Sequence, residues 1–255
     1  MMNIPRTWLF TILWFLPSLG FAQDNSDKEI RRLGHFTKIE NTTDFELIFT
    51  DRGGAGTLIA QGTKNARESL LTEVVDGVLK IDKKPTKNHL PKLPFFKATL
   101  TVHEPLKVVV SCPDLNHYVT QGSGSTVLLA QRFRDLKLEA TGTGIVHLSK
   151  CRLYSLEAKL NGTGKIEFSR CDVTDTRLQL EGKGQILAHD LHSKNTNALL
   201  IGEGKITTWA TDFLDAKVVG KGLLFYRGNP PSLKQQAQQG GTIDRYFPGS
   251  EKEAP

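Results

Sequence analysis

The chain has 255 residues, a formal net charge of +6 and 38% hydrophobic residues, which is enough apolar material for one sizeable domain. The positive charge is too small to indicate nucleic-acid binding by itself. Lys and Arg also alternate with Asp and Glu instead of forming a basic ladder, which argues against such binding. Three cysteines, Cys112, Cys151 and Cys171, are too few for a disulfide framework and lack the Cys-x-x-Cys spacing of zinc or redox sites.

The first 22 residues have the three parts of a secretory signal peptide. Arg6 ends a short basic start, an apolar run follows at residues 8–16, and Gly20 and Ala22 supply a small-residue end. The apolar run is shorter than the roughly 20 residues that cross a bilayer, and no later segment is apolar enough to span one. We therefore expect cleavage after Ala22 and a periplasmic or secreted, cell-surface protein. Residues 23–34 are expected to be a flexible N-terminus.

Residues 35–110 are predicted to be the irregular opening of a β-helix domain that spans residues 35–228. Short segments at 45–49, 57–60 and 78–81 have the composition and flanking turn residues of strands. Residues 64–75 are expected to form either a short helix or the edge of a coil. Because repeat arrays need atypical ends that cover exposed strand edges, residues 229–255 are expected to form a C-terminal cap or tail.

A basic stretch interrupts this opening at residues 83–97, which contain no Asp or Glu. Its three prolines prevent regular strand pairing, so we expect a projecting loop. Basic residues among apolar ones suit an anionic partner such as envelope lipid, lipopolysaccharide or an acidic polysaccharide. The candidate contact residues are Lys83, Lys84, Lys87, Lys92, Phe95, Phe96 and Lys97. The alternative is a solvated connector whose Phe95 or Phe96 packs back onto the protein.

Residues 111–228 repeat a Gly-x-Gly pair at nearly constant spacing. The first glycines lie 20 residues apart four times and then 18 residues apart once, at Gly122, Gly142, Gly162, Gly182, Gly202 and Gly220. A fixed period of this size indicates a solenoid or repeat array. Glycine suits a corner between two strands because positive φ, or the close approach of successive coils, disfavours any residue that carries a Cβ atom.

Apolar side chains alternate with others on both sides of each Gly-x-Gly pair. Two residues after the second glycine the chain has Thr126, Val146, Ile166, Ile186, Ile206 and Leu224. A period of two is typical of a half-buried strand, and twenty residues give a contour of about 66 Å, enough for a closed circuit. Parallel crossovers are right-handed in nearly all cases. The sequence therefore predicts an all-β fold, a right-handed parallel β-helix with about twenty residues per coil.

Two other repeat architectures fit less well. Leucine-rich repeats require an Asn or Cys and a helical segment that the repeats lack, and calcium-binding β-rolls require Asp where Val146 and Ile166 stand. In the preferred β-helix, Cys151 and Cys171 lie one coil apart. Two stacked thiols are preferred there over a disulfide, which leaves the disulfide state a matter for experiment.

The segment Leu71-Thr-Glu-Val-Val-Asp-Gly-Val-Leu-Lys-Ile81, a Thr-Leu-Thr-Val stretch at 99–102 and the Gly-x-Gly ladder together resemble a bacterial family. This family is the putative autotransporter adhesin head, or GIN domain, a domain of unknown function. The resemblance covers roughly residues 35–228 and implies a right-handed β-helix in an exported bacterial protein. It brings no catalytic residues, and the basic stretch at 83–97 is longer than the resemblance implies.

No arrangement of residues in the sequence forms a recognisable active site. The outward positions beside the glycines stack no two carboxylates, as glycan cleavage would need, and His189 with His192 is a weak metal signal. We therefore predict no catalytic, cofactor-binding or metal-binding residues. The predicted function is a non-enzymatic exported binding or adhesion-type module of the bacterial cell envelope. The alternatives are a carbohydrate-active β-helix enzyme with its site in the N-terminal third, and a purely structural envelope protein.

Overall fold

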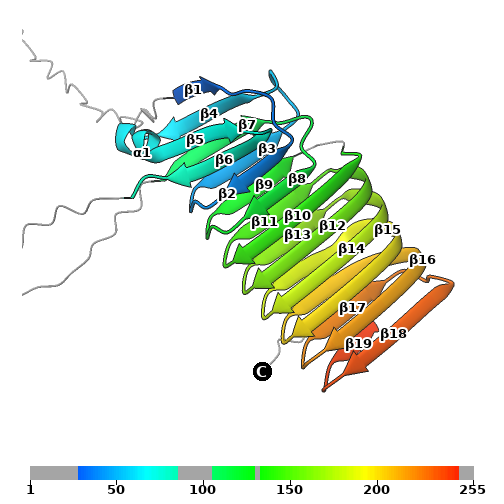
Figure 1. Cartoon of the computed structure of the whole chain (residues 1–255). Coiled ribbons are helices and arrows are strands. Elements are labelled where there is room, and N and C mark those ends of the chain that lie inside the picture. The colour runs from blue at the N-terminus through cyan, green and yellow to red at the C-terminus, as the bar shows by residue number, and fades with distance from the viewer. Residues whose placement is uncertain (1–27, 86–104, 130–132, 247–255) are drawn as a thin grey trace, which may run out of the picture.

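Each regular coil is built from two strands that meet at a Gly-x-Gly corner. The computed structural model describes residues 28–85, 105–129 and 133–246, and in this part of the chain it forms a parallel β-solenoid of about six turns. The coils stack along one axis, from green to orange in Figure 1. The regular strands are β10 (Asp135–Gly142), β11 (Ile145–Ser149), β12 (Arg152–Gly162), β13 (Lys165–Ser169), β14 (Cys171–Gly182), β15 (Gln185–Gly202), β16 (Lys205–Val219) and β17 (Leu223–Arg227). The prediction of an all-β solenoid is confirmed.

In the parallel register, residues twenty positions apart in the sequence lie side by side on neighbouring strands. Leu138 of β10 lies beside Ala158 of β12, and Val146 of β11 lies beside Ile166 of β13. Residues at each of these positions are buried, so the alternating apolar residues form one continuous core inside the coils. The strands form two rows, one before and one after the Gly-x-Gly corners, and the outward residues of each row face solvent.

The corner glycines are required by backbone geometry. Gly162 has φ of +125°, and a Cβ atom there would lie 2.7 Å from the carbonyl oxygen of Gly142 in the previous coil. Gly164 has no such φ, but its Cβ atom would lie 2.6 Å from the carbonyl oxygen of Gly144. Both distances are shorter than side-chain contacts allow, so close stacking of the corners excludes any larger residue.

The N-terminal coils are threaded out of sequence order. The first coil, β2 (Lys38–Asn41) and β3 (Glu46–Thr50), lies between two later ones. On one side β2 pairs with β6 (Val78–Lys83) and β3 pairs with β7 (Leu106–Ser111). On the other side they pair with β8 (His117–Thr120) and β9 (Ser125–Leu129), which lead into the regular coils.

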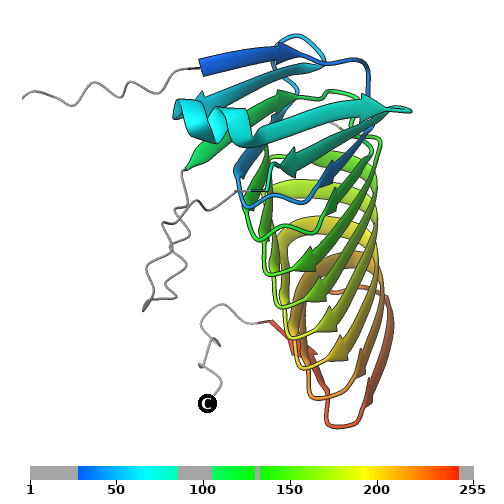
Figure 2. The same cartoon turned by 60° about the vertical axis from the view of Figure 1, so that its left-hand side comes forward.

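Antiparallel strands cover the N-terminal end of the stack. On one row, β1 (Lys28–Arg32) pairs with β4 (Thr57–Gly62), which pairs with β7. On the other row, β5 (Leu70–Val75) pairs with β6. Helix α1 (Lys64–Ser69) lies between β4 and β5 in the chain, with Thr63 as its N-cap, and Figures 1 and 2 show it at this end of the molecule. The segment 64–75 is therefore a short helix followed by an edge strand.

The C-terminal segment forms one more coil. Strands β18 (Ser232–Gln238) and β19 (Thr242–Arg245) pair in parallel with β16 and β17, in the same register as the coils before them. All seven residues of β18 are exposed, including Leu233 at 43%, because no described strand lies beyond it. Regular solenoid pairing thus continues into the segment predicted as a cap or tail.

Cys151 and Cys171 lie together inside the solenoid. Both are buried thiols without a disulfide, and the backbone N–H of Asp172 donates to the carbonyl oxygen of Cys151 at 3.0 Å. A hydrogen bond with the Cys151 thiol is the main cause that lowers the pKa of the Cys171 thiol, against the opposing effect of burial. The twenty-residue spacing therefore stacks the two side chains, as the sequence indicated.

Candidate binding surface

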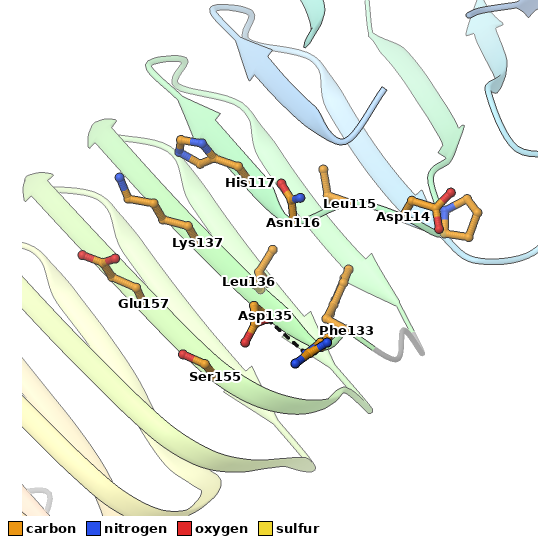
Figure 3. Close-up of a pocket in the computed structure, with 12 residues that line it drawn as sticks. Asp114, Leu115, Asn116, His117, Phe133, Asp135, Leu136, Lys137, Ser155 and Glu157 are labelled. Atoms are coloured by element: carbon orange, nitrogen blue, oxygen red, sulfur yellow. Dashed lines mark ion pairs between the residues drawn. The ribbon is translucent and has the colours of Figure 1, made fainter. Parts of the chain in front are cut away.

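A shallow pocket of about 690 Å³ opens on the outer face of β8, β10 and β12. One row of its polar side chains consists of His117, Lys137 and Glu157, which the parallel register places side by side on successive strands. Figure 3 shows these three side chains standing in one line on the sheet. Leu115, Phe133 and Leu136 are buried beneath the pocket and give it an apolar floor.

Glu139, on the strand β10 beside the pocket, contacts two residues of this row. His117 Nε2 lies 3.1 Å from Glu139 Oε1, and Lys137 Nζ contacts the same carboxylate. The hydrogen bond from Lys137 is the main cause that lowers the pKa of Glu139, and Glu139 in return raises the pKa of Lys137. Glu139 is therefore held ionised, so it is suited to accept hydrogen bonds but not to donate a proton.

The carboxylates that line the pocket are paired as well. Glu157 lies 3.1 Å from Lys159, and Asp114 lies 3.6 Å from His35. Asp135 lies 3.7 Å from Arg134, whose own side chain is 90% exposed. General acid catalysis on a glycan needs two carboxyl groups that face a common point in different protonation states. The pocket instead presents alternating fixed charges and an exposed guanidinium, an arrangement suited to holding a polar ligand.

The structure describes two of the seven residues predicted to contact an anionic partner. Lys83 ends β6 and lies on the solenoid, with Nζ 2.9 Å from Asp44 Oδ1 and 5.1 Å from the centre of the Phe45 ring. It lines a second pocket of about 380 Å³ beside the corner at Gly122. Lys84 is exposed, and its backbone N–H donates to the carbonyl oxygen of Ser69. The other five lie outside the described residues: Lys87, Lys92, Phe95, Phe96 and Lys97.

The residues of the main pocket were not identified from the sequence. The signal that finds them is the twenty-residue spacing of His117, Lys137 and Glu157, a row adjacent to the outward rows considered in the sequence. Asp114 and Arg134 have the same twenty-residue spacing, but they lie at strand ends where the chain turns. Their place beside the row is a consequence of the turns before β8 and β10.

Within residues 28–85, 105–129 and 133–246, no three His, Cys, Asp or Glu side chains converge as metal ligands would. His192 Nδ1 lies 3.3 Å from Asp172, and His189 Nδ1 lies 3.5 Å from the Thr207 hydroxyl. The same residues contain no helix with the length and hydrophobicity needed to cross a bilayer.

Fold and surface together define a class: parallel β-solenoids that present long, charge-paired outer faces around a continuous apolar core. Within this class the chain belongs to the family described as "Putative auto-transporter adhesin, head GIN domain", whose model matches residues 35–230. The resemblance drawn from the sequence is thereby confirmed. Among curated proteins, none matches the chain.

Solved structures share the solenoid. A putative adhesin from Bacteroides fragilis matches with a TM-score of 0.73 at 23% identity, covering 86% of this chain and 96% of that chain. A putative lipid binding protein from Parabacteroides distasonis matches with a TM-score of 0.63 at 22% identity, covering 88% and 98%. A putative adhesin from Parabacteroides merdae matches with a TM-score of 0.62 at 18% identity, covering 87% and 96%. At these identities the likeness establishes the fold.

Proposed function

We propose that this chain is an exported, non-enzymatic binding or adhesion-type module of the bacterial cell envelope. The observation that carries the proposal is the open pocket on β8, β10 and β12, where charged side chains are paired along a row instead of converging on one reacting atom. A rigid solenoid holds such a row in place without the cost of ordering it on binding. Family membership supports the same reading, since its name describes an adhesin head.

The proposed partners are components of the envelope. An acidic polysaccharide or the head group of an anionic lipid suits the exposed Arg134, whose only ion pair among the described residues is with the adjacent Asp135. The solved relative described as a lipid binding protein makes lipid a class to be tested alongside glycans. Export through the predicted signal peptide at residues 1–22 would bring the chain to these partners.

The test is a paired assay on one preparation of the protein. The chain is incubated with immobilised polysaccharides and with phosphatidylglycerol vesicles, and the supernatant is analysed by mass spectrometry for cleavage products. We expect retention without products, and we expect Arg134→Gln to weaken retention about tenfold through the loss of a charge-assisted contact. Lys194→Gln is the matched control, because Lys194 is an exposed cation on β15, remote in the stack from β8 and β10.

Two outcomes would replace the proposal by its alternatives. Release of oligosaccharides would favour a carbohydrate-active enzyme with a site in the N-terminal third. No retention on any surface would favour a purely structural envelope protein.

A further inference from the structure

The change of period from 20 to 18 residues marks an irregularity in the outer surface. Between β15 and β16 the register is Leu187 with Thr207, an offset of 20, but His192 with Trp209, an offset of 17. Between these two pairs β15 has three more residues than β16, which forms a bulge on the row of strands that follows the glycine corners. Bulges commonly redirect side chains next to functional sites. Here the bulge carries His189 and leads into His192.

An aromatic–basic cluster lies at this bulge, formed by His189, His192, Trp209, Arg227 and Tyr246. Trp209 and Arg227 are paired in register on β16 and β17, and Tyr246 follows β19 on the next coil. The backbone N–H of Tyr246 donates to the carbonyl oxygen of Tyr226 at 2.8 Å, which continues the same register. Trp209, Arg227 and Tyr246 thus follow one another, one per coil, and Figure 1 shows β16, β17 and β19 near the C-terminal end of the stack.

The side chains of the cluster hold one another in place. The guanidinium carbon of Arg227 lies 4.5 Å from the centre of the Trp209 ring and 5.7 Å from that of Tyr246. His192 meets the Trp209 ring edge-on at 4.1 Å, and His189 stacks on Tyr246 at 5.7 Å. Trp209, Arg227 and Tyr246 are all half-buried, so their backbones and lower parts are fixed while their outer edges reach solvent. Such rigid groups lose little conformational entropy when a ligand binds.

The charge of Arg227 has no acidic partner among the described residues. Its one hydrogen bond there runs from Nη1 to the carbonyl oxygen of His189 at 3.4 Å, which leaves most of its five N–H groups available. By contrast, Lys38, Lys137 and Lys159 on the opposite row each contact a glutamate, and so does Lys165 on an earlier coil of the row that contains Arg227. Lys205, on the strand next to that of Arg227, resembles Arg227 in this respect, because its Nζ lies 5.7 Å from the centre of the Phe225 ring and has no carboxylate partner in the described chain.

We infer that the aromatic–basic cluster is a binding site for an acidic polysaccharide, in which Arg227 holds a uronate carboxylate. A planar guanidinium recognises a carboxylate through two parallel hydrogen bonds, and stacking between rings orients it for that purpose. The exposed parts of Trp209 and Tyr246 offer apolar surface to the C–H faces of the flanking sugars. The three coils span about 10 Å, so a linear glycan lying along the axis would meet one of these side chains on each coil.

A lipid surface fits this cluster less well than a glycan. Attachment to a bilayer relies on apolar side chains that protrude into the interface, together with several free lysines. The rings of the cluster are instead half-buried and packed against one another. The inference deepens the proposed function and rests on it, but the cluster and the pocket of Figure 3 lie on different rows of strands. Arg134→Gln and Arg227→Gln therefore test them separately.

The wild-type protein provides a direct readout. Of the three tryptophans, Trp8 and Trp14 belong to the predicted signal peptide, so a chain beginning at residue 23 contains Trp209 as its single tryptophan. All described residues are retained in that chain. The probes are polygalacturonate, alginate and hyaluronate, with uncharged dextran and phosphatidylglycerol vesicles in parallel. We expect at least one uronate polymer, and neither control, to produce a saturable change in the Trp209 fluorescence.

Variants assign the effect to Arg227. Arg227→Gln should weaken uronate binding about tenfold, and Arg227→Lys should recover it only in part because the paired hydrogen bonds are lost. Arg177→Gln is the matched control, since Arg177 is an exposed arginine on β14 in the opposite row. Equal melting temperatures confirm that the variants fold. The inference is overturned if no uronate polymer changes the fluorescence of the wild type, if Arg227→Gln binds as well as the wild type, or if vesicles alone produce the response.

Discussion

At the scale of single residues, neighbours along a strand have opposite environments. Ile166 is fully buried in the core, and Glu167 points outward, where it lies 2.7 Å from Lys165. We expect Ile166→Asp to cost several kcal/mol, on the order expected for a buried, unpaired carboxylate. Glu167→Ala removes a surface ion pair and should change the free energy of unfolding by about 0.5 kcal/mol or less. Urea unfolding of both variants checks this prediction. Equal midpoints would contradict the placement of Ile166 in the core and of Glu167 on the surface.

The buried thiols give a second test at this scale. Cys151 and Cys171 stack on successive coils, where parallel neighbours direct their Cβ atoms side by side instead of toward each other. We expect both to remain reduced even in an oxidising compartment. Titration of the denatured protein should detect three thiols per chain, including Cys112. A Cys151–Cys171 cross-linked peptide in mass spectra of the unreduced protein would show that the two thiols form a disulfide and would contradict this expectation.

At the scale of elements, substitutions at two corner glycines distinguish backbone strain from steric overlap between coils. Gly142 and Gly162 both have positive φ, of +103° and +125°, but a Cβ atom at Gly142 would lie 3.7 Å from its nearest neighbour and one at Gly162 only 2.7 Å. We expect Gly142→Ala to cost about 1–3 kcal/mol from backbone strain. Gly162→Ala should cost about 1–3 kcal/mol more, because a backbone carbonyl must also move. Thermal unfolding checks the order, and a larger loss for Gly142→Ala would contradict close stacking as the second cause.

The ion pairs between strands predict a modest acid sensitivity. The pKa of Glu139 is lowered from its ordinary value of 4.5, chiefly by the hydrogen bond from Lys137. Its contribution to stability is therefore present above the unfolded-state pKa and is lost as the pH falls through the lower folded-state pKa. Glu139 is about one-third exposed, so solvent screening limits this contribution to about 0.5 kcal/mol.

The corresponding experiment compares two substitutions. Unfolding midpoints measured from pH 7 to pH 3 should decline less steeply in Glu139→Gln than in the wild type. Glu73→Gln, at an exposed glutamate of β5, serves as the control and should follow the wild-type curve. Parallel curves for all three proteins would show that the Lys137 contact does not influence stability.

At the scale of the whole molecule, binding of an anionic partner by the basic stretch at residues 83–97 remains a prediction. Lys83 is engaged by Asp44 on the solenoid, so we separate it from the other four lysines. Replacing Lys84, Lys87, Lys92 and Lys97 with Gln should weaken attachment to anionic lipid or acidic glycan and leave the melting temperature unchanged. High salt should weaken the wild type similarly, because such contacts are screened beyond about 10 Å at 0.1 M. Salt-independent attachment, or none, would make this stretch a connector.

The sequence by itself determined the regular part of the molecule. A twenty-residue period places like residues side by side on neighbouring coils, so the strands, the buried set containing Ile166 and the glycine corners all follow from local alternation and spacing. The family resemblance follows in part from the same pattern, since it rests on the Gly-x-Gly ladder together with the segments at 71–81 and 99–102.

Only the tertiary structure decided where the exceptions lie. The spacing along the chain does not reveal that β2 lies between β6 and β8, because the first coil is inserted between two later ones by contacts distant in sequence. The aromatic–basic cluster joins a bulge in β15 to Tyr246, three coils away. Repetition specifies the neighbours of a regular strand, but an interruption of the repeat acquires its neighbours from the way the whole chain packs.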